Sequence, residues 1–376
     1  MHSKASVIPV IVIVIVIVIF GMLAIVSPDA FAVGVDSNKE TEKPITVATQ
    51  NQPADNTEKK LKIAFLTDGL FSDAGWGAFG YNAAQALQGK YSYIVDLKEN
   101  VPIPKIEETL REHAKAGYDL IIAHGFEWGK PAVKVGKEYP ETKFAIFTGL
   151  VNSNNVASIY PMQQEATYVL GALAASMSKT GTIGFVGGER YPNLINIYEG
   201  YRQGAHDINP TVKVLVTYLD DWDNPTKGKR AAISQIDKGA DLLLHVADTS
   251  GHGVIEAAKE RGIYAFGAIS DQNKLAPETV LTSFVLDVEK AFDQVIRLVQ
   301  AGNFVGQIFK PGLELKKGSP GDGIVYIAPY HSLEHTVPDN VKIRLEQLKG
   351  NIVNGKIKVP ERYSNNNGSY LAGNRG

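Results

Sequence analysis

The pattern of apolar and polar positions divides the chain into an apolar N-terminal segment, a polar connection and a long region that folds. Residues 7–26 form an almost unbroken apolar run rich in Val and Ile, with Lys4 before it. The run reaches the ~20 residues that a helix needs to cross a bilayer. Its repeated β-branched residues have no amphipathic face, which argues against a buried core helix.

The segment that follows this run indicates export. Ala30-Phe31-Ala32 has the small-x-small pattern that signal peptidases cut. Residues 1–32 are therefore predicted to be either a cleaved signal peptide or a retained membrane anchor. Either outcome places the remainder of the chain outside the cytoplasm. The polar residues 33–60 are predicted to form a flexible linker, and the polar residues 361–376 a disordered tail.

From Leu61 onward, short apolar runs alternate with amphipathic stretches, which is typical of βα units around a parallel sheet. A first series predicts strands at 62–66, 93–97, 120–123, 143–147 and 156–159, with helices between them such as 76–87 and 106–116. A second series predicts helices at 168–177, 194–207, 227–238 and 253–261, and strands at 182–186, 212–219, 242–246 and 264–268. A strand at 280–284, a helix at 288–300 and a late strand at 323–327 complete the set.

Two consecutive series of this size predict an α/β fold with two doubly wound parallel-sheet lobes, a hinge and a cleft between the lobes. The chain of 376 residues is long enough for two such cores. We expect lobe 1 to comprise 61–159 and 280–310, and lobe 2 to comprise 160–279 and 311–360. Three crossovers between the lobes are then expected near Ile159, Thr279 and Lys310.

Composition narrows the functional classes. The formal net charge of −2 gives no polycationic surface, so nucleic acid is not expected as a partner. The chain has no cysteine. This excludes a disulfide, a thiolate metal site, a cysteine nucleophile and a lipid-modified N-terminal cysteine. Any attachment to a membrane must therefore come from the N-terminal peptide segment.

Doubly wound sheets bind ligands outside the carboxyl ends of their strands, so the residues that follow the strands are the candidates for a site. In the first series, Asp68, Asp73 and Trp76 follow the first strand, and His124 and Phe126 follow the third. Two interpretations stay open. Asp73 and Trp76 are either a helix cap with a packing aromatic or a ligand acceptor with a stacking face. His124 is either a ligand contact or a hydrogen-bonded histidine at the end of a strand.

The second series offers a similar set of candidates. Trp222 lies among acidic residues ahead of a helix, either as a second stacking face or as a packed surface lid. After the next strand, Asp248, Ser250 and Gly251 stand where hydroxyls and backbone N–H groups at a helix N-terminus can reach a ligand. Asp271 follows the strand after that. Each signal is weak alone, but together they mark the carboxyl edges of both predicted sheets.

Several short motifs appear in a fixed order through the chain, at 72–76, 124–126, 168–171, 184–188, 221–229, 239–241, 270–272 and 281–283. On these motifs, the chain from Leu61 to about Tyr330 resembles the basic membrane protein family of ABC-transporter substrate-binding proteins. The resemblance implies purine nucleoside receptors with the periplasmic-binding-protein type I fold, no cofactor, and ABC permease subunits as partners.

The resemblance also implies roles for individual residues. Trp76 and Trp222 would stack on the two faces of a purine base, and Asp68 and Asp271 would supply the carboxylates that hold the base edge and the ribose hydroxyls, with Asp73 marking the turn. Many members of the family carry a lysine where this chain has Leu286. Because such a lysine would touch the ligand, its replacement leaves open whether the ligand is a nucleoside, a free base or another small molecule.

Three other functional classes were weighed. A nucleoside-processing enzyme would need clustered aspartates or a nucleophile with its base, whereas these aspartates are spread one to a loop, and HExxH, GxSxG and P-loop patterns are absent from the sequence. A regulator of the lac-repressor kind would need an N-terminal helix-turn-helix in place of the export signal. A membrane-anchored nucleoside-sensing receptor without transport remains an alternative.

Overall fold

The computed structural model describes residues 60–73, 75–91, 94–359 and 361. The chain falls into two units, 1–57 and 58–376, and the description below concerns the second. The predicted signal or anchor segment, nearly all of the linker and the tail from residue 362 lie outside the described residues. Within the described part of the chain, no helix has both the length and the hydrophobicity that crossing a bilayer requires.

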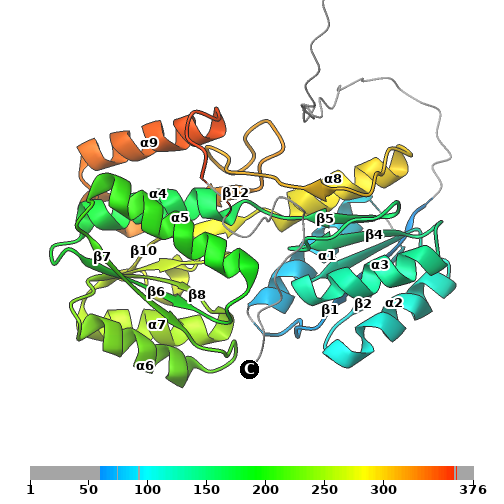
Figure 1. Cartoon of the computed structure of the whole chain (residues 1–376), viewed down its shortest axis with the longest axis horizontal. Coiled ribbons are helices and arrows are strands. Elements are labelled where there is room, and N and C mark those ends of the chain that lie inside the picture. The colour runs from blue at the N-terminus through cyan, green and yellow to red at the C-terminus, as the bar shows by residue number, and fades with distance from the viewer. Residues whose placement is uncertain (1–59, 74, 92–93, 360, 362–376) are drawn as a thin grey trace, which may run out of the picture. The chain divides into compact units, whose positions relative to one another are not determined.

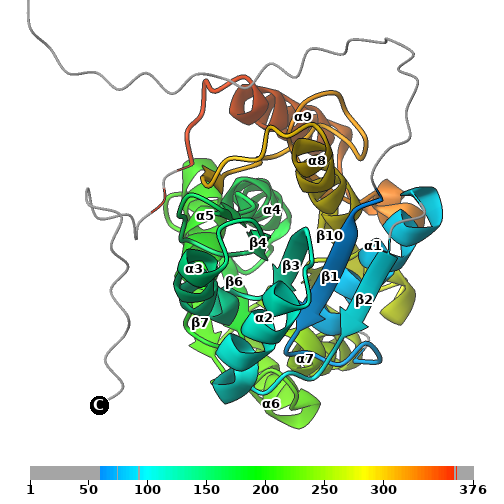
Figure 2. The ribbon, with the colours of Figure 1, turned by 90° about the vertical axis from the view of Figure 1, so that its right-hand side faces the viewer.

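Two six-stranded sheets organise the described residues (Figure 1). The first has the order β11-β5-β4-β3-β1-β2 and is parallel throughout; Figure 2 shows β1, β2 and β3 side by side. Its strands are β1 (Lys62–Thr67), β2 (Ile94–Lys98), β3 (Leu120–His124), β4 (Lys143–Phe147), β5 (Val156–Ile159) and β11 (Ile308–Phe309). Every residue of β3 and β5 is buried, as expected of parallel strands that are covered on both faces.

The second sheet has the order β12-β10-β9-β8-β6-β7. All of its pairs are parallel except β10 with β12. Its strands are β6 (Thr182–Gly187), β7 (Lys213–Tyr218), β8 (Leu242–Val246), β9 (Tyr264–Gly267), β10 (Val280–Leu286) and β12 (Val325–Ile327). The two mostly parallel sheets confirm the predicted fold class of two doubly wound α/β lobes.

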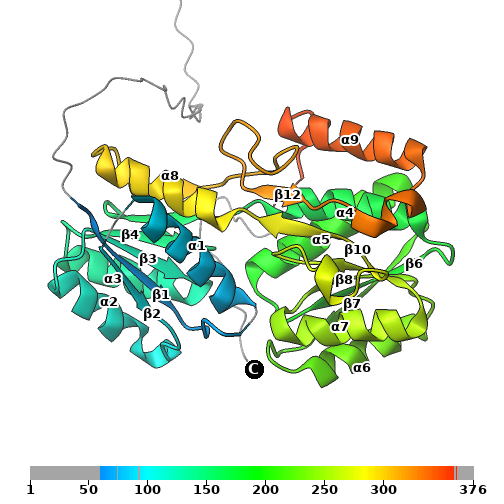
Figure 3. The ribbon, with the colours of Figure 1, turned by 180° about the vertical axis from the view of Figure 1, so that it is seen from behind.

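Helices cover both faces of each sheet (Figures 1 and 3). In the first lobe, α1 (Trp76–Tyr91) and α8 (Val288–Gln300) lie on one face, and α2 (Ile106–Lys115) and α3 (Gly129–Glu138) on the other. In the second lobe, α4 (Gln163–Met177) and α5 (Pro192–Ile208) lie opposite α6 (Pro225–Ile236) and α7 (Asp248–Arg261). The last helix, α9 (Asp339–Val353), packs against α4. Short 3-10 turns lie at Ile103–Lys105, Phe126–Trp128, Asn273–Leu275 and His331–Thr336.

The strand pairing corrects one predicted lobe boundary. Residues 280–310 were predicted to belong to lobe 1, but β10 pairs with β9 and β12 and therefore belongs to the second sheet. The chain enters the first lobe only with α8, where Phe292 packs on Phe65 with ring centroids 5.8 Å apart. The crossover expected near Thr279 thus lies after Leu286. The other two changes of sheet come after Ile159 and after Phe309.

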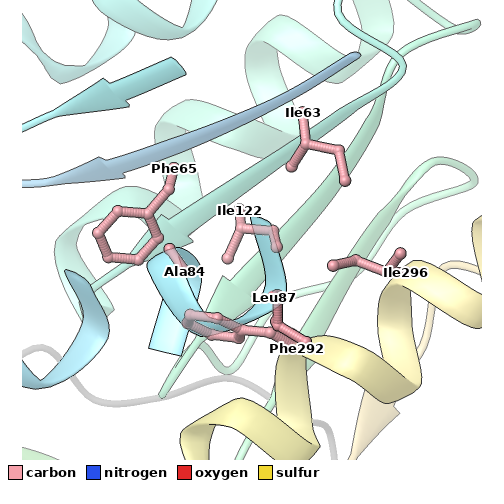
Figure 4. A pocket seen from close by; sticks show the side chains of 7 residues that line it. All are labelled: Ile63, Phe65, Ala84, Leu87, Ile122, Phe292 and Ile296. Atoms are coloured by element: carbon pink, nitrogen blue, oxygen red, sulfur yellow. The ribbon is translucent and has the colours of Figure 1, made fainter. Parts of the chain in front are cut away.

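A small gap remains in the core of the first lobe, between the sheet and helices α1 and α8 (Figure 4). Its volume is about 10 Å³, roughly the space of one water molecule. All of its lining residues are apolar: Ile63, Phe65, Ala84, Leu87, Ile122, Phe292 and Ile296. A gap with no polar partner for water is expected to stay dry, so it is a packing imperfection and not a ligand site.

Candidate ligand-binding site

A cavity of about 400 Å³ lies at the carboxyl ends of the strands and receives residues from both lobes. This volume is within the usual range of small-molecule sites. The first lobe contributes Asp68, Gly69, Leu70, Asp73, Gly75, Trp76, Phe79, Asn100, Gly125, Phe126, Glu127 and Thr148. The second contributes Gln163, Tyr191, Asn193, Leu194, Trp222, Asp223, His245, Val246, Ala247, Asp248, Ala268, Ile269, Ser270 and Gln272.

Unusual backbone conformations gather around this cavity. Six described residues other than glycine have positive φ, and four of them line the cavity. They are Asn100 (φ 52°), Thr148 (φ 60°), Asp248 (φ 47°) and Ile269 (φ 69°). Positive φ is strained for the β-branched Thr148 and Ile269. Such strain persists where the surrounding structure enforces it, and it concentrates at binding sites.

Asp73 both caps α1 and lines the cavity. Its carboxylate accepts hydrogen bonds from the backbone N–H groups of Gly75 (2.7 Å), Gly77 (2.8 Å) and Ala78 (2.9 Å). These are N–H groups that have no partner inside the first turn of a helix. The two interpretations from sequence are therefore compatible, since the carboxylate fixes the turn that presents Trp76 to the cavity.

Trp76 is half-buried and is held from behind by His124. The two rings stack with centroids 3.9 Å apart, and the His124 ring stacks in turn on Phe147 at 5.2 Å. The His124 Nε2 atom lies 3.1 Å from the Trp76 carbonyl oxygen. Burial lowers the pKa of His124 to about 3, so its ring is neutral at physiological pH. His124 is fully buried and does not line the cavity. It supports the Trp76 ring from the side away from the cavity.

Asp248 connects the two lobes. Its carboxylate, on the first residue of α7, accepts the backbone N–H of Trp76 at 3.2 and 3.4 Å. A side chain on Gly75 would lie 1.8 Å from the Asp248 Oδ1 atom, so only glycine permits this approach. Burial, together with the charge of Asp73, raises the pKa of Asp248 to about 7. The sequence predicts that this helix begins at Gly253, but it begins at Asp248 itself.

Two carboxyl groups meet around Gly125. The Asp68 Oδ1 atom and the Glu127 Oε2 atom both lie 3.2 Å from the point where a Cβ of residue 125 would be. Gly125 has a φ of 151°, a conformation that side-chain-bearing residues rarely adopt. Burial raises the pKa of both carboxyl groups, and the charge of Asp68 further raises that of Glu127.

An aromatic row crosses from one lobe to the other. Tyr191 of the second lobe lies 6.0 Å from Phe126 of the first and 6.0 Å from Trp222, measured between ring centroids. The Tyr191 hydroxyl is hydrogen-bonded to Glu127 and to Glu189. Burial and these two carboxylates raise the pKa of Tyr191 far above its usual range, so the hydroxyl keeps its proton.

Four of the predicted site residues lie elsewhere. Besides His124, Ser250 is buried, where its hydroxyl accepts the Asn224 N–H at 2.8 Å. Gly251 packs against His245, whose ring leaves no room for a Cβ. Asp271 is exposed, its carboxylate 2.7 Å from the His331 Nε2 atom. None of the four lines the cavity, so their predicted ligand contacts have no support in this geometry.

Several cavity residues were not predicted from sequence. Glu127 directly follows Phe126, one of the predicted residues, in the turn after β3. Tyr191, Gln163 and Asn193 come from the starts of α4 and α5, where amides and tyrosines carry no distinctive signal. Gln163 is 3% exposed. Its Oε1 atom, like the Oδ1 atom of Asn193, has no hydrogen-bond partner among the described residues.

The electrostatics of the cavity favour ligands that donate hydrogen bonds. Its charged residues are Asp68, Asp73, Glu127, Asp223 and Asp248, and no lysine or arginine is among the described residues that line it. A phosphate or carboxylate would meet like charge without a cation to compensate. A neutral or positively charged ligand with N–H or O–H groups meets suitable acceptors.

Two curated proteins illustrate the relatives of this chain. The "Purine-binding protein BAB2_0673" of Brucella abortus is 30% identical over 310 residues, covering 81% of this chain and 84% of that protein. The "Transcriptional activator protein med" of Bacillus subtilis is 30% identical over 246 residues, covering 65% and 77%. Since these two names describe different roles, likeness alone does not fix the role of this chain.

Solved structures show the same fold. An ABC transporter system solute-binding protein from Aeropyrum pernix superimposes with a TM-score of 0.71 at 25% identity, covering 81% of this chain and 94% of that one. The family model described as "ABC transporter substrate-binding protein PnrA-like" matches residues 60–363, which include both lobes and every residue that lines the cavity. The chain therefore belongs to the PnrA-like family of ABC transporter substrate-binding proteins.

Proposed function

We propose that this protein captures a purine nucleoside, or a closely related purine, in the cavity between its lobes and delivers it to an ABC permease. One observation carries the proposal. A cavity of about 400 Å³ combines a tryptophan from each lobe with five carboxyl groups, and no lysine or arginine is among its described lining residues. Flat aromatic faces suit a base, and carboxylates suit the amino and hydroxyl groups of a nucleoside.

Stacking supplies the part of the binding energy that depends little on which base is bound. A base stacked on an aromatic side chain gains about 1–3 kcal/mol. Trp76 is the better prepared surface, because His124 and Phe147 support its ring from behind. Trp222 would contribute from the second lobe, next to Tyr191. The purine-binding name of the Brucella relative agrees with this ligand class.

We further propose that binding leaves the ligand chemically unchanged. Two of the five cavity carboxylates, those of Asp73 and Asp248, accept backbone N–H groups and are engaged in fixing the backbone. Purified protein incubated with adenosine or guanosine should release neither base nor ribose phosphate. Chromatographic detection of either product would show that the protein is an enzyme.

The ligand itself can be identified directly. Mass spectrometry of the small molecules that co-purify with the folded protein, followed by calorimetry with the purines found, tests the proposal. We expect a purine to be released on denaturation and to rebind at one site per chain. Co-purification of a sugar or an amino acid, with no heat change on adding purines, would overturn it.

The proposed place of action is outside the cytoplasm, facing the permease. It rests on the N-terminal apolar run, which lies outside the described residues, and on membership of a transporter family. N-terminal sequencing of the protein from its native host would show whether residues 1–32 have been removed. Recovery of the mature chain in the cytoplasmic fraction would contradict the proposed location.

A further inference from the structure

The cavity contains more hydrogen-bond acceptors than its own residues satisfy. Gln163 is 3% exposed, and its Oε1 atom has no partner among the described residues. The Oδ1 atom of Asn193 is likewise buried and has no hydrogen-bond partner among the described residues. A buried acceptor without a donor costs roughly 1–3 kcal/mol, so such atoms point to a ligand that donates to them.

The strongest acceptors are Asp68 and Glu127, which follow β1 and β3 at the same edge of the first sheet. Both carboxyl groups lie 3.2 Å from the Cβ position of Gly125. Two carboxylates held this close repel each other unless donors lie between or beside them. Burial raises the pKa of each group and outweighs the protein's own hydrogen bonds, which lower it.

The protein supplies few donors to this pair. Trp128 interacts with Asp68, and Tyr191 reaches Glu127 from the second lobe and is shared with Glu189. No lysine or arginine is found among the described lining residues. The donors that would satisfy Asp68 and Glu127 must therefore come mainly from the ligand.

We propose that Asp68 and Glu127 select purines that carry an exocyclic amino group, with Glu127 as a specificity-determining residue. This inference rests on the proposed binding of purines. An amino group donates N–H bonds to a carboxylate, and these charge-assisted bonds are among the strongest available. A purine that presents only a carbonyl or C–H at that edge leaves the carboxylates unpaired. Sites with buried polar groups reject such analogues strongly.

Two pairs of ligands isolate the amino group. Guanosine differs from inosine only by the 2-amino group, and adenosine differs from purine riboside only by the 6-amino group. Calorimetry with each compound, as the nucleoside and as the free base, should show at least about tenfold weaker binding for the partner that lacks the amino group in at least one pair.

The variant Glu127→Gln tests the residue. The amide replaces an acceptor oxygen with a donor, so we expect the preference for the amino purine to fall to about threefold or less, mainly through loss of affinity for the amino purine. The matched control is Glu141→Gln, which makes the same change at an exposed glutamate outside the cavity lining and should keep the preference. Thermal unfolding of each variant establishes that it is folded.

The outcomes separate this inference from the proposed function. Equal affinity within both ligand pairs, or an unchanged preference in a folded Glu127→Gln protein, would overturn the selection by amino groups while purine binding stands. Absence of binding for all of the purines, as nucleosides and as bases, would overturn the proposed function as well. A preference that is lost in Glu127→Gln and kept in Glu141→Gln is the result that we expect.

Discussion

The two lobes share one architecture but contribute different chemistry to the cavity. The first lobe presents three carboxyl groups, those of Asp68, Asp73 and Glu127, around a supported tryptophan. The second presents a mixed wall of two aromatic rings, polar side chains such as Gln163 and Asn193, and apolar residues; its half-buried carboxyl group, Asp248, is turned toward the backbone of the first lobe. The apolar part of that wall consists of Leu194, Val246, Ala247, Ala268 and Ile269.

This difference indicates that the two lobes have different roles in recognising the ligand. The polar groups of the first lobe are fixed before a ligand arrives, because Asp73 is tied to three backbone N–H groups and Trp76 is stacked on His124. In the second lobe, Tyr191 and Asp248 instead make contacts across to the first lobe. We infer that the first lobe reads the polar edge of the ligand and that the second lobe covers it.

The largest expected effect follows from removing the supported aromatic face. Trp76→Ala should weaken purine binding by about 1–3 kcal/mol, roughly ten- to a hundredfold, measured by calorimetry. Because its ring packs on His124 and Phe147, we expect a lower melting temperature as well.

Trp76→Phe is the matched control, since it keeps an aromatic face and part of the packing. It should retain most of the affinity and most of the stability. If Trp76→Ala binds purines as tightly as the parent protein, the tryptophan serves packing alone. The first lobe would then provide no stacking surface for the base.

The contact between the lobes is expected to depend on pH through Asp248. Its pKa rises from 3.8 to about 7 in the folded protein, so between these values the folded state holds more protons than the unfolded state. Stability from this group is therefore greatest below pH 4, falls as the pH rises toward 7, and stays low above it.

Asp248→Asn should remove this dependence while keeping an acceptor for the Trp76 N–H. As the pH rises from 5 to 8, we expect the free energy of unfolding of the variant to increase relative to that of the parent by about 1–2 kcal/mol. This figure allows for solvent screening of the partly exposed side chain. Melting temperatures across this range measure the gain. A constant difference between the two proteins at all pH values would show that Asp248 does not titrate there.

The sequence predicted the scaffold better than the directions of individual side chains. Alternating apolar runs placed β4, β5, β8 and α8 at the observed bounds, because buried parallel strands need continuous apolar residues. It did not identify the two-residue strand β11 or the helix α9. It also assigned β10 to the wrong lobe, because a strand's sequence does not state which sheet it joins.

The same limit applies to the site. Six of the ten predicted residues line the cavity, since strand ends converge there: Asp68, Asp73, Trp76, Phe126, Trp222 and Asp248. Within one loop, however, Ser270 and Gln272 line the cavity and Asp271 between them does not. Unpaired acceptors such as Gln163 become visible only when the whole hydrogen-bond network is known.

A smaller effect is expected where the aromatic row meets the carboxyl pair. Tyr191→Phe keeps the ring between Phe126 and Trp222 but removes the hydroxyl that is bonded to Glu127. Loss of one such hydrogen bond should lower purine affinity by about 1 kcal/mol, roughly fivefold. Calorimetry beside Tyr191→Ala, which also removes the ring, separates the two contributions. Identical affinities for the Phe variant and the parent would show that this bond does not matter for binding.

The smallest effect is expected at Asp271, where resemblance and structure disagree. If Asp271 held the ribose, its replacement by Asn would reduce the binding free energy of a nucleoside by about 1.5–3 kcal/mol and that of the free base by much less. In the structure its carboxylate is exposed, lies 2.7 Å from His331 Nε2 and accepts the Asn273 N–H, outside the cavity lining. We therefore expect Asp271→Asn to change the affinity for adenosine and for adenine by less than about twofold each, because exposed pairs of this kind contribute little. Calorimetry with both ligands decides between the two views. A large loss confined to adenosine would mean that Asp271 turns toward the ligand on binding and that the second lobe also reads the sugar, in which case polar recognition is shared between the lobes.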